Sequence, residues 1–119
     1  MNNKEFAKEL EKRTKIFAVK ILKLSAKLPN TIEANFVRKQ ISKSGTSVGA
    51  NYREANRSRS KADFASKERI CESEASETVF WLEIIQEFKW IEENELLEML
   101  NEANELLAIF STIGKTLKG

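Results

Sequence analysis

The sequence predicts an all-α protein: an antiparallel up-down-up-down four-helix bundle that assembles as an oligomer. One proline and four glycines in 119 residues are too few breaks for many short strands joined by turns. Apolar residues recur at three- and four-residue steps over four long stretches. The connections between these stretches are short, so neighbouring helices should run antiparallel. At this length the helices form a single domain, residues 1–119.

The first helix is expected over residues 4–27. Its apolar side chains, from Phe6 to Leu28, recur at helical spacing and so share one face. Pro29 then ends the helix, because proline disfavours helical geometry in the residue before it.

The second helix is expected over residues 32–56, with Asn30 or Thr31 as its cap. Its middle contains two glycines, and each interior glycine costs a helix about 1 kcal/mol relative to alanine. We nevertheless extend the helix through them, because Gly45 and Gly49 lie four residues apart and form a face of small residues. Such a face lets the backbone of another helix approach closely.

The third helix is expected from a capping box at Ser60 and Asp63 to about Phe88, and it carries two apolar faces. The fourth begins near Asn94 and carries a heptad seam of Leu96, Leu100, Ala103, Leu107, Phe110, Gly114 and Leu117. An isolated bundle needs one apolar stripe per helix. The additional apolar residues therefore predict contact with another subunit.

Composition argues against several functional classes. The chain has no histidine, which removes the commonest general base and most zinc sites, so we expect no enzymatic activity, no cofactor and no metal. Cys71 is the single cysteine and is expected to be an inert core residue. With no signal peptide or membrane-spanning stretch, the protein is expected in the cytoplasm, away from membranes.

Charge is distributed unevenly along the chain. Residues 1–59 contain fourteen Lys and Arg against five Asp and Glu, whereas residues 60–119 contain six against thirteen. Such asymmetry indicates either a polyanionic partner for the basic half or attraction between the two halves, within one bundle or between subunits.

Residues 40–55 and a set of positions in the following helix resemble the motif of a known family. The motif positions are Ser44, Ser47, Ala50, Asn51, Glu54, Asp63, Phe64, Glu74, Glu77, Trp81 and Leu82. The family is the 23S rRNA-intervening-sequence proteins, or S23 ribosomal proteins, related to the accessory variability protein of diversity-generating retroelements. The resemblance covers nearly the whole chain. It implies a bacterial homopentamer of up-down bundles and, in the retroelement branch only, nucleic acid and a reverse transcriptase as partners.

Basic residues of the first two helices are the candidate nucleic-acid-binding residues. They are Lys8, Lys12, Lys15, Lys20, Lys23, Lys39, Lys43, Arg53, Arg57 and Arg59. Lysines and arginines along one surface neutralise phosphates of structured RNA or DNA without reading sequence. The resemblance favours this interpretation over a merely solvated face. The alternative function is a protein–protein interaction scaffold that does not bind nucleic acid.

Glu74 and Glu77 are two carboxylates one helical turn apart, as in an acid/base pair or half of a metal site. Carboxylate metal sites in bundles use Glu-x-x-His motifs, which a chain without histidine lacks. We therefore expect these glutamates to accept hydrogen bonds from Asn51, Arg53 or Arg69, within the bundle or across an interface.

Residues 44–49 combine serine, threonine and glycine as some phosphate-binding loops do. The order lacks the Gly-Lys-Ser/Thr ending of a P-loop, and no strand precedes it. These residues are expected to form the close-packing face of the second helix, with hydroxyls bonded to the preceding turn.

Overall fold

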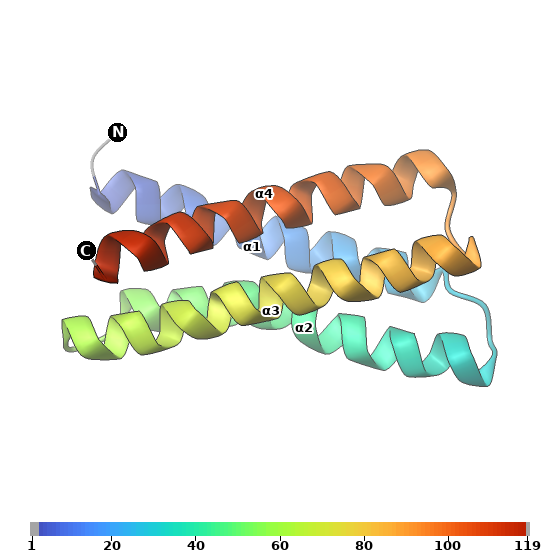
Figure 1. Cartoon of the computed structure of the whole chain (residues 1–119), viewed down its shortest axis with the longest axis horizontal. Coiled ribbons are helices and arrows are strands. Elements are labelled where there is room, and N and C mark those ends of the chain that lie inside the picture. Colours follow the sequence, from blue (N-terminus) through green and yellow to red (C-terminus); the bar gives the residue numbers. More distant parts are fainter. Residues whose placement is uncertain (1–2, 119) are drawn as a thin grey trace.

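The computed structural model describes residues 3–118, and the regular secondary structure in that range is entirely helical. The helices are α1 (Asn3–Ala26), α2 (Ile32–Asn56), α3 (Lys61–Phe88) and α4 (Glu93–Lys118). They form an elongated four-helix bundle with Cα dimensions of 44 × 25 × 22 Å (Figure 1). The predicted all-α class is confirmed, and the predicted helix ends differ from the observed ones by at most one or two residues.

Helices that follow one another in the sequence lie side by side. The first turn of α1 and the last turn of α4 lie at one end of the bundle, while the α1–α2 and α3–α4 connections lie at the other (Figure 1). α2 packs against α1 and α3, and α3 also packs against α4. The fourth edge, between α1 and α4, is much looser, because the two backbones approach each other at few places.

The helix ends have side-chain and backbone caps that satisfy their free polar groups. Thr31 accepts a hydrogen bond from the amide of Ala34, and Ser60 accepts one from the amide of Asp63. Both are N-caps, as predicted. α3 ends at Lys89, whose φ of 57° places it in the left-handed region. A residue in this conformation commonly follows the last helical turn, because it redirects the chain.

One stripe from each helix forms the core. Its largest fully buried apolar side chains are Phe17, Ile21, Leu24, Ile41, Val48, Leu82, Ile85, Leu96, Leu106 and Phe110. Tyr52 and Phe110 meet edge to face with ring centroids 5.5 Å apart, which links α2 to α4 across the centre. Cys71 is fully buried, as expected, and burial raises the pKa of its thiol to about 12.

The predicted heptad seam of α4 is only partly correct. Leu96, Ala103 and Phe110 are buried, but Leu100 and Leu107 are only half-buried and Leu117 is exposed. The core stripe instead includes Met99 and Leu106. α4 carries two adjacent apolar lines with a seven-residue period, and the sequence alone does not show which one faces the centre.

Gly45 and Gly49 lie within an uninterrupted α2, as predicted. A Cβ atom at Gly45 would lie 2.6 Å from Cγ2 of Ile21, and one at Gly49 would lie 3.0 Å from Oγ1 of Thr14. α1 is therefore the helix that uses the small-residue face, and the side chains of Ile21 and Thr14 occupy the space that a side chain at either glycine would need. The predicted back-bonding is also present: Thr46 and Ser47 each donate a hydrogen bond to a carbonyl of the preceding turn, at 2.7 Å.

None of the helices in residues 3–118 combines the length and the apolar character needed to cross a membrane.

Candidate nucleic-acid interface

The ten basic residues proposed from the sequence are all exposed. Lys8, Lys12, Lys15, Lys20 and Lys23 lie on α1, Lys39, Lys43 and Arg53 on α2, and Arg57 and Arg59 in the connection to α3. Because α1 and α2 are neighbours, the structure brings these residues to two adjoining helices. The lysines of α1 fall into two groups: Lys20 and Lys23 lie toward α4, and Lys8 and Lys15 lie toward α2.

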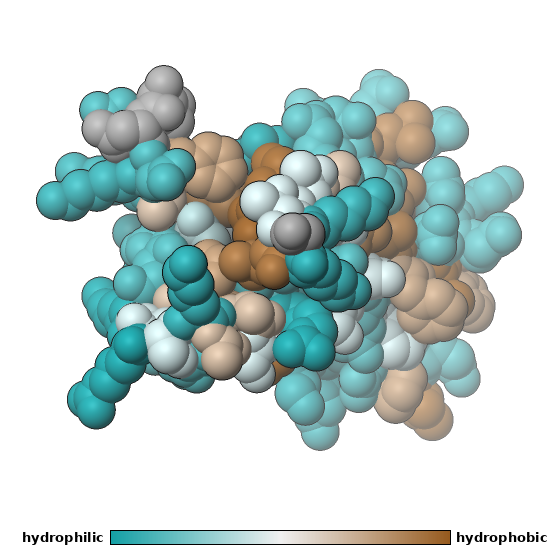
Figure 2. All heavy atoms as spheres, turned by 60° about the vertical axis from the view of Figure 1, so that its left-hand side comes forward, coloured by the Kyte–Doolittle hydropathy of each residue, from teal (hydrophilic) through white to brown (hydrophobic). Residues whose placement is uncertain are grey.

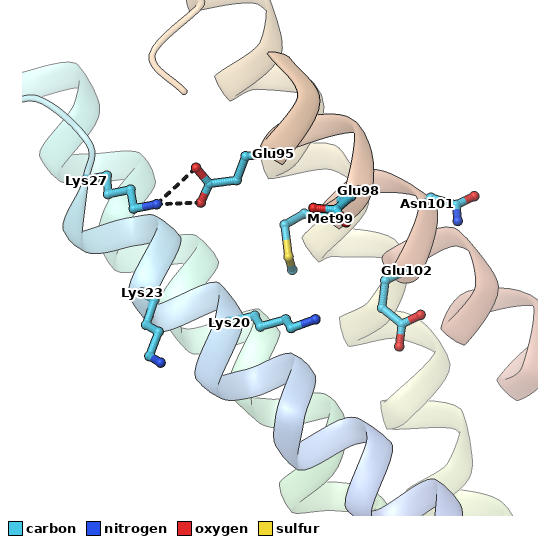
Figure 3. A pocket seen from close by; sticks show the side chains of 8 residues that line it. All are labelled: Lys20, Lys23, Lys27, Glu95, Glu98, Met99, Asn101 and Glu102. Carbon is cyan, nitrogen blue, oxygen red and sulfur yellow. Dashed lines mark hydrogen bonds and ion pairs between the residues drawn. The ribbon is translucent and has the colours of Figure 1, made fainter. Parts of the chain in front are cut away.

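Along the edge of α1 that faces α4, basic residues meet acidic ones. The guanidinium of Arg13 donates two hydrogen bonds to Glu102, at 2.8 and 2.7 Å, and a third to Glu105 at 3.0 Å. The hydrogen bond with Glu102 is the main reason that the pKa of Arg13 is raised above its usual value. Lys27 pairs with Glu95 at 2.9 Å (Figure 3). Attraction between the basic and acidic halves thus operates within the bundle.

A groove of about 490 Å³ lies between α1 and α4, beside these ion pairs (Figure 3). It is lined by Lys20, Lys23, Lys27, Glu95, Glu98, Met99, Asn101 and Glu102. Lys20 extends toward α4 in this view. Two of the candidate residues, Lys20 and Lys23, therefore share a groove with three carboxylates, which weaken any attraction for phosphate.

Along the edge between α1 and α2, two neighbouring hollows together hold four basic residues and two carboxylates. A groove of about 310 Å³ contains Lys15 and Arg53 together with Glu11 and Glu54. Arg53 approaches Glu11 at 3.8 Å, which is a loose, exposed ion pair. A neighbouring hollow of about 440 Å³ is lined by Lys4, Ala7, Lys8, Glu11 and Asn56. Glu11 also accepts a hydrogen bond from the side-chain amide of Asn56, at 2.9 Å.

Arg38 belongs to the basic half but has a structural role. Its Nε donates to the carbonyl of Ser25 at 3.0 Å, and its terminal nitrogen donates to the carbonyl of Leu28. These carbonyls lie at the C-terminal end of α1, where helical partners run out. Arg38 therefore secures the α1–α2 connection and does not belong to the candidate interface.

Glu74 does not have the partners that the sequence suggested. Its Oε1 atom is buried without a hydrogen-bond partner, and burial and the nearby charge of Glu77 raise the pKa of its carboxyl. Asn51, one expected donor, binds the carbonyl of Ser47 instead. The expectation of a partner within the bundle is thus wrong for this oxygen, because the side-chain amide of Asn51 donates to a carbonyl of its own helix instead. A partner across an interface stays a prediction.

Aromatic side chains cover the neighbouring surface of α2 and α3. Trp81 meets Phe36 and Phe80 edge to face, at centroid distances of 5.8 and 5.0 Å. Phe36 is 56% exposed, Phe80 is 51% exposed, and the indole Nε1 of Trp81 is buried without a partner. The second apolar face predicted for the third helix is therefore present. The contribution of Phe36 was missed, although its spacing from the still more exposed Ile32 marks a second apolar line on α2.

A further apolar hollow of about 300 Å³ is lined by Phe6, Ala108, Ile109, Thr112 and Ile113, between the start of α1 and the last turns of α4. Figure 2 shows apolar side chains reaching the surface between charged ones at this end of the molecule. Phe6, expected in the core stripe of the first helix, is 42% exposed here. It lies one turn before Leu10, the first buried residue of α1.

Comparison with known proteins places this bundle in a family. The model of the 23S rRNA-intervening sequence proteins matches residues 8–112. The chain belongs to the 23S rRNA-intervening sequence protein family. A crystal structure of a protein of unknown function from the S23 ribosomal protein family of Bacteroides thetaiotaomicron VPI-5482 is similar, with 36% identity and a TM-score of 0.81. The match covers 88% of this chain and 97% of that one. Among curated proteins, none matches the chain.

The family motif suggested by the sequence lies mainly on the facing sides of α2 and α3. Ser44 is buried and accepts a hydrogen bond from Thr78 at 2.9 Å, and Leu82 lies in the core. Ser47, Asn51, Glu74, Trp81 and Phe64 are half-buried, and Ala50, Glu54 and Glu77 are exposed. Asp63 lies in the first turn of α3, where its amide donates to the capping Ser60 and its carboxylate pairs with Lys67 at 3.0 Å. Part of the motif of this 23S rRNA-intervening sequence protein therefore builds the bundle, and part reaches the surface.

Proposed function

We propose that this protein is a non-enzymatic, oligomeric, nucleic-acid-associated protein of the cytoplasm, and that it contacts phosphates of structured RNA through α1 and α2. One observation carries the proposal: all ten candidate basic residues are exposed, and only Arg53 among them makes an ion pair in the described part of the chain. The basic residues that do pair with α4, Arg13 and Lys27, belong to a different edge of α1.

The α1/α2 edge is the best-supported phosphate-binding surface. Lys8 and Lys15 are seven residues apart, so they project from one side of α1. Lys15 lines a hollow with Arg53 of α2, and Lys8 lines the neighbouring one. Arg57 and Arg59 follow directly at the end of α2. Lys20 and Lys23 contribute less in this proposal, because carboxylates of α4 share their groove. No aromatic side chain lines the two α1/α2 hollows, which favours backbone contacts with structured RNA over stacking on single strands.

We further propose that the bundle is antiparallel, up-down-up-down, and that several copies assemble, as the resemblance to pentameric relatives implies. The common position of the α1–α2 and α3–α4 connections supports the topology. The exposed aromatic surface around Phe36 and Phe80 supports assembly, since apolar area and unpartnered polar atoms such as Oε1 of Glu74 and Nε1 of Trp81 suit an interface.

A salt series of binding to structured RNA and duplex DNA tests the phosphate contacts. We expect the logarithm of the affinity to fall linearly with the logarithm of the salt concentration. Neutralising Lys8 and Lys15 together, as Lys8→Gln and Lys15→Gln, should lower the slope by about 2, roughly one unit for each lost contact. The matched control neutralises two exposed lysines away from α1 and α2, Lys89→Gln and Lys115→Gln, and should leave the slope unchanged.

The interaction scaffold is the second candidate, and the ion pairs between α1 and α4 favour it, because they show that oppositely charged surfaces of this chain attract each other. Absence of RNA and DNA binding at low salt, or equal effects of the two double variants, would contradict the phosphate-binding surface. The scaffold would then be the better account of the basic half.

A further inference from the structure

The last two turns of α4 are the least anchored part of that helix. Phe110 is fully buried, but none of residues 111–118 beyond it has a buried side chain. On one side these turns border the apolar hollow that contains Phe6, which is itself 42% exposed. On the other side they lie against α3, where a cleft of about 370 Å³ runs between the two helices. Their attachment to the bundle therefore depends largely on what they meet on α3.

Two carboxyl groups of α3 lie beneath these turns. A Cβ atom at Gly114 would lie 3.1 Å from Oε2 of Glu68 and 3.1 Å from Oε2 of Glu72, so the backbone of α4 passes close to both. Ser111 donates a hydrogen bond to Oε1 of Glu72 at 3.1 Å. The end of α4 thus rests on two groups that repel each other when both are ionised.

Glu68 is the buried member of this pair. It is only 1% exposed, and its Oε1 atom is buried without a hydrogen-bond partner in the described part of the chain. Burial without partners disfavours the charged form of a carboxyl group far more than the protonated form. Burial and the charge of Glu72 accordingly raise the pKa of Glu68 to about 7. The docked position of α4 therefore suits the protonated side chain.

The basic residues of the cleft only partly offset the cost of ionising Glu68. Arg69 of α3 and Lys115 and Lys118 of α4 line the cleft and are exposed to solvent. Arg69 and Lys118 act to lower the pKa of Glu68, but burial and Glu72 outweigh them. Charges that are exposed to water are screened, so they stabilise a buried carboxylate weakly.

The other titratable groups nearby keep their protonation state through neutral pH. Tyr52 of α2 and Cys71 of α3 are buried, and burial raises the pKa of both side chains. Glu11 of α1 adds to the rise for Tyr52. Both side chains are therefore protonated and uncharged at pH 7, and Glu68 is the member of this buried group that changes its charge near neutrality.

We propose that residues 111–118 of α4 form a pH-gated cover over Glu68: they stay docked on α3 while this carboxyl is protonated and open locally when it loses its proton. Opening lets water solvate the carboxylates of Glu68 and Glu72, whereas the core up to Phe110 stays packed. Local opening of this kind is drawn from segments with few buried contacts, as these turns are. The end of α4 is therefore docked below neutral pH and opens more often above it.

Proton linkage gives the direction and the size of the effect. Glu68 has a pKa of about 7 while the cover is docked and returns to the ordinary value of 4.5 once water reaches it. Opening therefore becomes more favourable as the pH rises from about 4.5 to 7 and changes little above that. Each pKa unit corresponds to a factor of ten, so the opening equilibrium should rise on the order of 100-fold between about pH 5 and 8.

Amide hydrogen exchange of the full chain between about pH 5 and 8, expressed as protection relative to the unstructured chain, tests the cover. We expect the protection of the amides of residues 111–114 to fall on the order of 100-fold over this range. The last turn of α3, residues 85–88, lies at the other end of the bundle (Figure 1) and should keep its protection, because its opening does not expose Glu68. Glu68→Gln, which cannot ionise, should remove the pH dependence at residues 111–114.

Two further variants make the test specific. Glu87→Gln removes an exposed carboxylate of the same helix and should behave like the wild type. Glu72→Gln removes the charge beside Glu68 and should make the fall in protection smaller, which provides the test even if Glu68→Gln does not fold. The proposal is overturned if protection at residues 111–114 does not depend on pH, is already absent at about pH 5, falls equally in Glu68→Gln, or is lost equally at both ends of the bundle.

Discussion

The two edges of α1 are built in opposite ways. Toward α2, Gly45 and Gly49 leave no space for side chains, and their backbone lies directly against Ile21 and Thr14. Toward α4, the backbones stay apart, and the space is occupied by long charged side chains and a groove of about 490 Å³. One helix thus contacts one neighbour through close van der Waals packing and the other through ion pairs.

The difference shows what each kind of contact does for the fold. Close packing loses energy steeply when a single atom is added or removed, so it fixes the distance between two helices. Half-exposed ion pairs contribute little free energy and tolerate small displacements. The α1/α2 contact should therefore contribute most to the free energy of unfolding. The ion pairs between α1 and α4 should mainly influence which charged side chains of α4 face α1.

Among the substitutions that test this difference between the two edges, Gly45→Ala should have the largest effect on the free energy of unfolding. Its Cβ would meet Cγ2 of Ile21 at 2.6 Å and Cβ of Ile21 at 3.0 Å, and the latter atom cannot rotate away. Overpacking of about 3 kcal/mol, offset by about 1 kcal/mol of helix propensity, predicts a net loss of about 2 kcal/mol in the free energy of unfolding. Urea denaturation measures it. In an Ile21→Ala background the same substitution should cost less, and an unchanged cost would refute the proposed steric cause.

The α3/α4 edge provides the next test, because its glycine, Gly114, lies against the ends of carboxylate side chains, whereas Gly45 lies against the branched side chain of Ile21. The pKa of Glu68 is raised from 4.5 to about 7, so the folded state keeps a proton that the unfolded state releases. The stability of the wild type should therefore fall between about pH 4.5 and 7. Glu68→Gln lacks this loss and should be roughly 1–2 kcal/mol more stable at pH 8, with no advantage near pH 4.

Urea denaturation of both proteins across this pH range checks that expectation. Glu87→Gln serves as the control, since it removes an exposed carboxylate from the same helix. A difference between Glu68→Gln and the wild type that stays constant with pH would contradict the buried, proton-linked carboxyl.

The smallest effect is expected at the α1/α4 edge. Arg13 and Glu102 form a bidentate pair, but their side chains are still 36% and 29% exposed. Glu102→Gln should therefore cost only about 0.5–1 kcal/mol, and less in high salt. Glu98→Gln, in the same groove without an ion pair among the described residues, should cost less still. If the two variants lose equal stability, the pairing across this edge is unimportant.

The fold could be predicted from the sequence because the residues that begin and end each helix act on their immediate neighbours in the chain. Pro29, Thr31 and Ser60 mark helix ends within a few residues of where they act, and apolar spacing identifies the helices. The packing of Gly45 and Gly49 was also predicted, since small residues at helical spacing have few other uses. The identity of the helix that they contact, α1, came only from the structure.

The candidate site was predicted less completely. The ten basic residues could be predicted to be exposed because they lie off the apolar stripe. Which of them share a groove with acidic residues of α4 depends on where α4 lies. Lys15 and Lys20 look equivalent in the sequence, yet Lys15 shares a groove with Arg53 and two glutamates, whereas Lys20 shares one with two lysines and three glutamates. Glu68 was missed although it falls on the buried stripe of α3, at helical spacing from Cys71 and Ala75, and only the structure shows that its Oε1 atom is buried without a partner.

The glycine contact between α1 and α2 also fixes the arrangement of charge on the surface above it. Lys8 and Lys15 are about 10 Å apart along a helix that cannot slide against α2. A phosphate backbone that binds across both helices meets positions that are already in place, so only the flexible lysine and arginine side chains lose conformational entropy. Such binding should bury little apolar area, and its heat-capacity change should be close to zero.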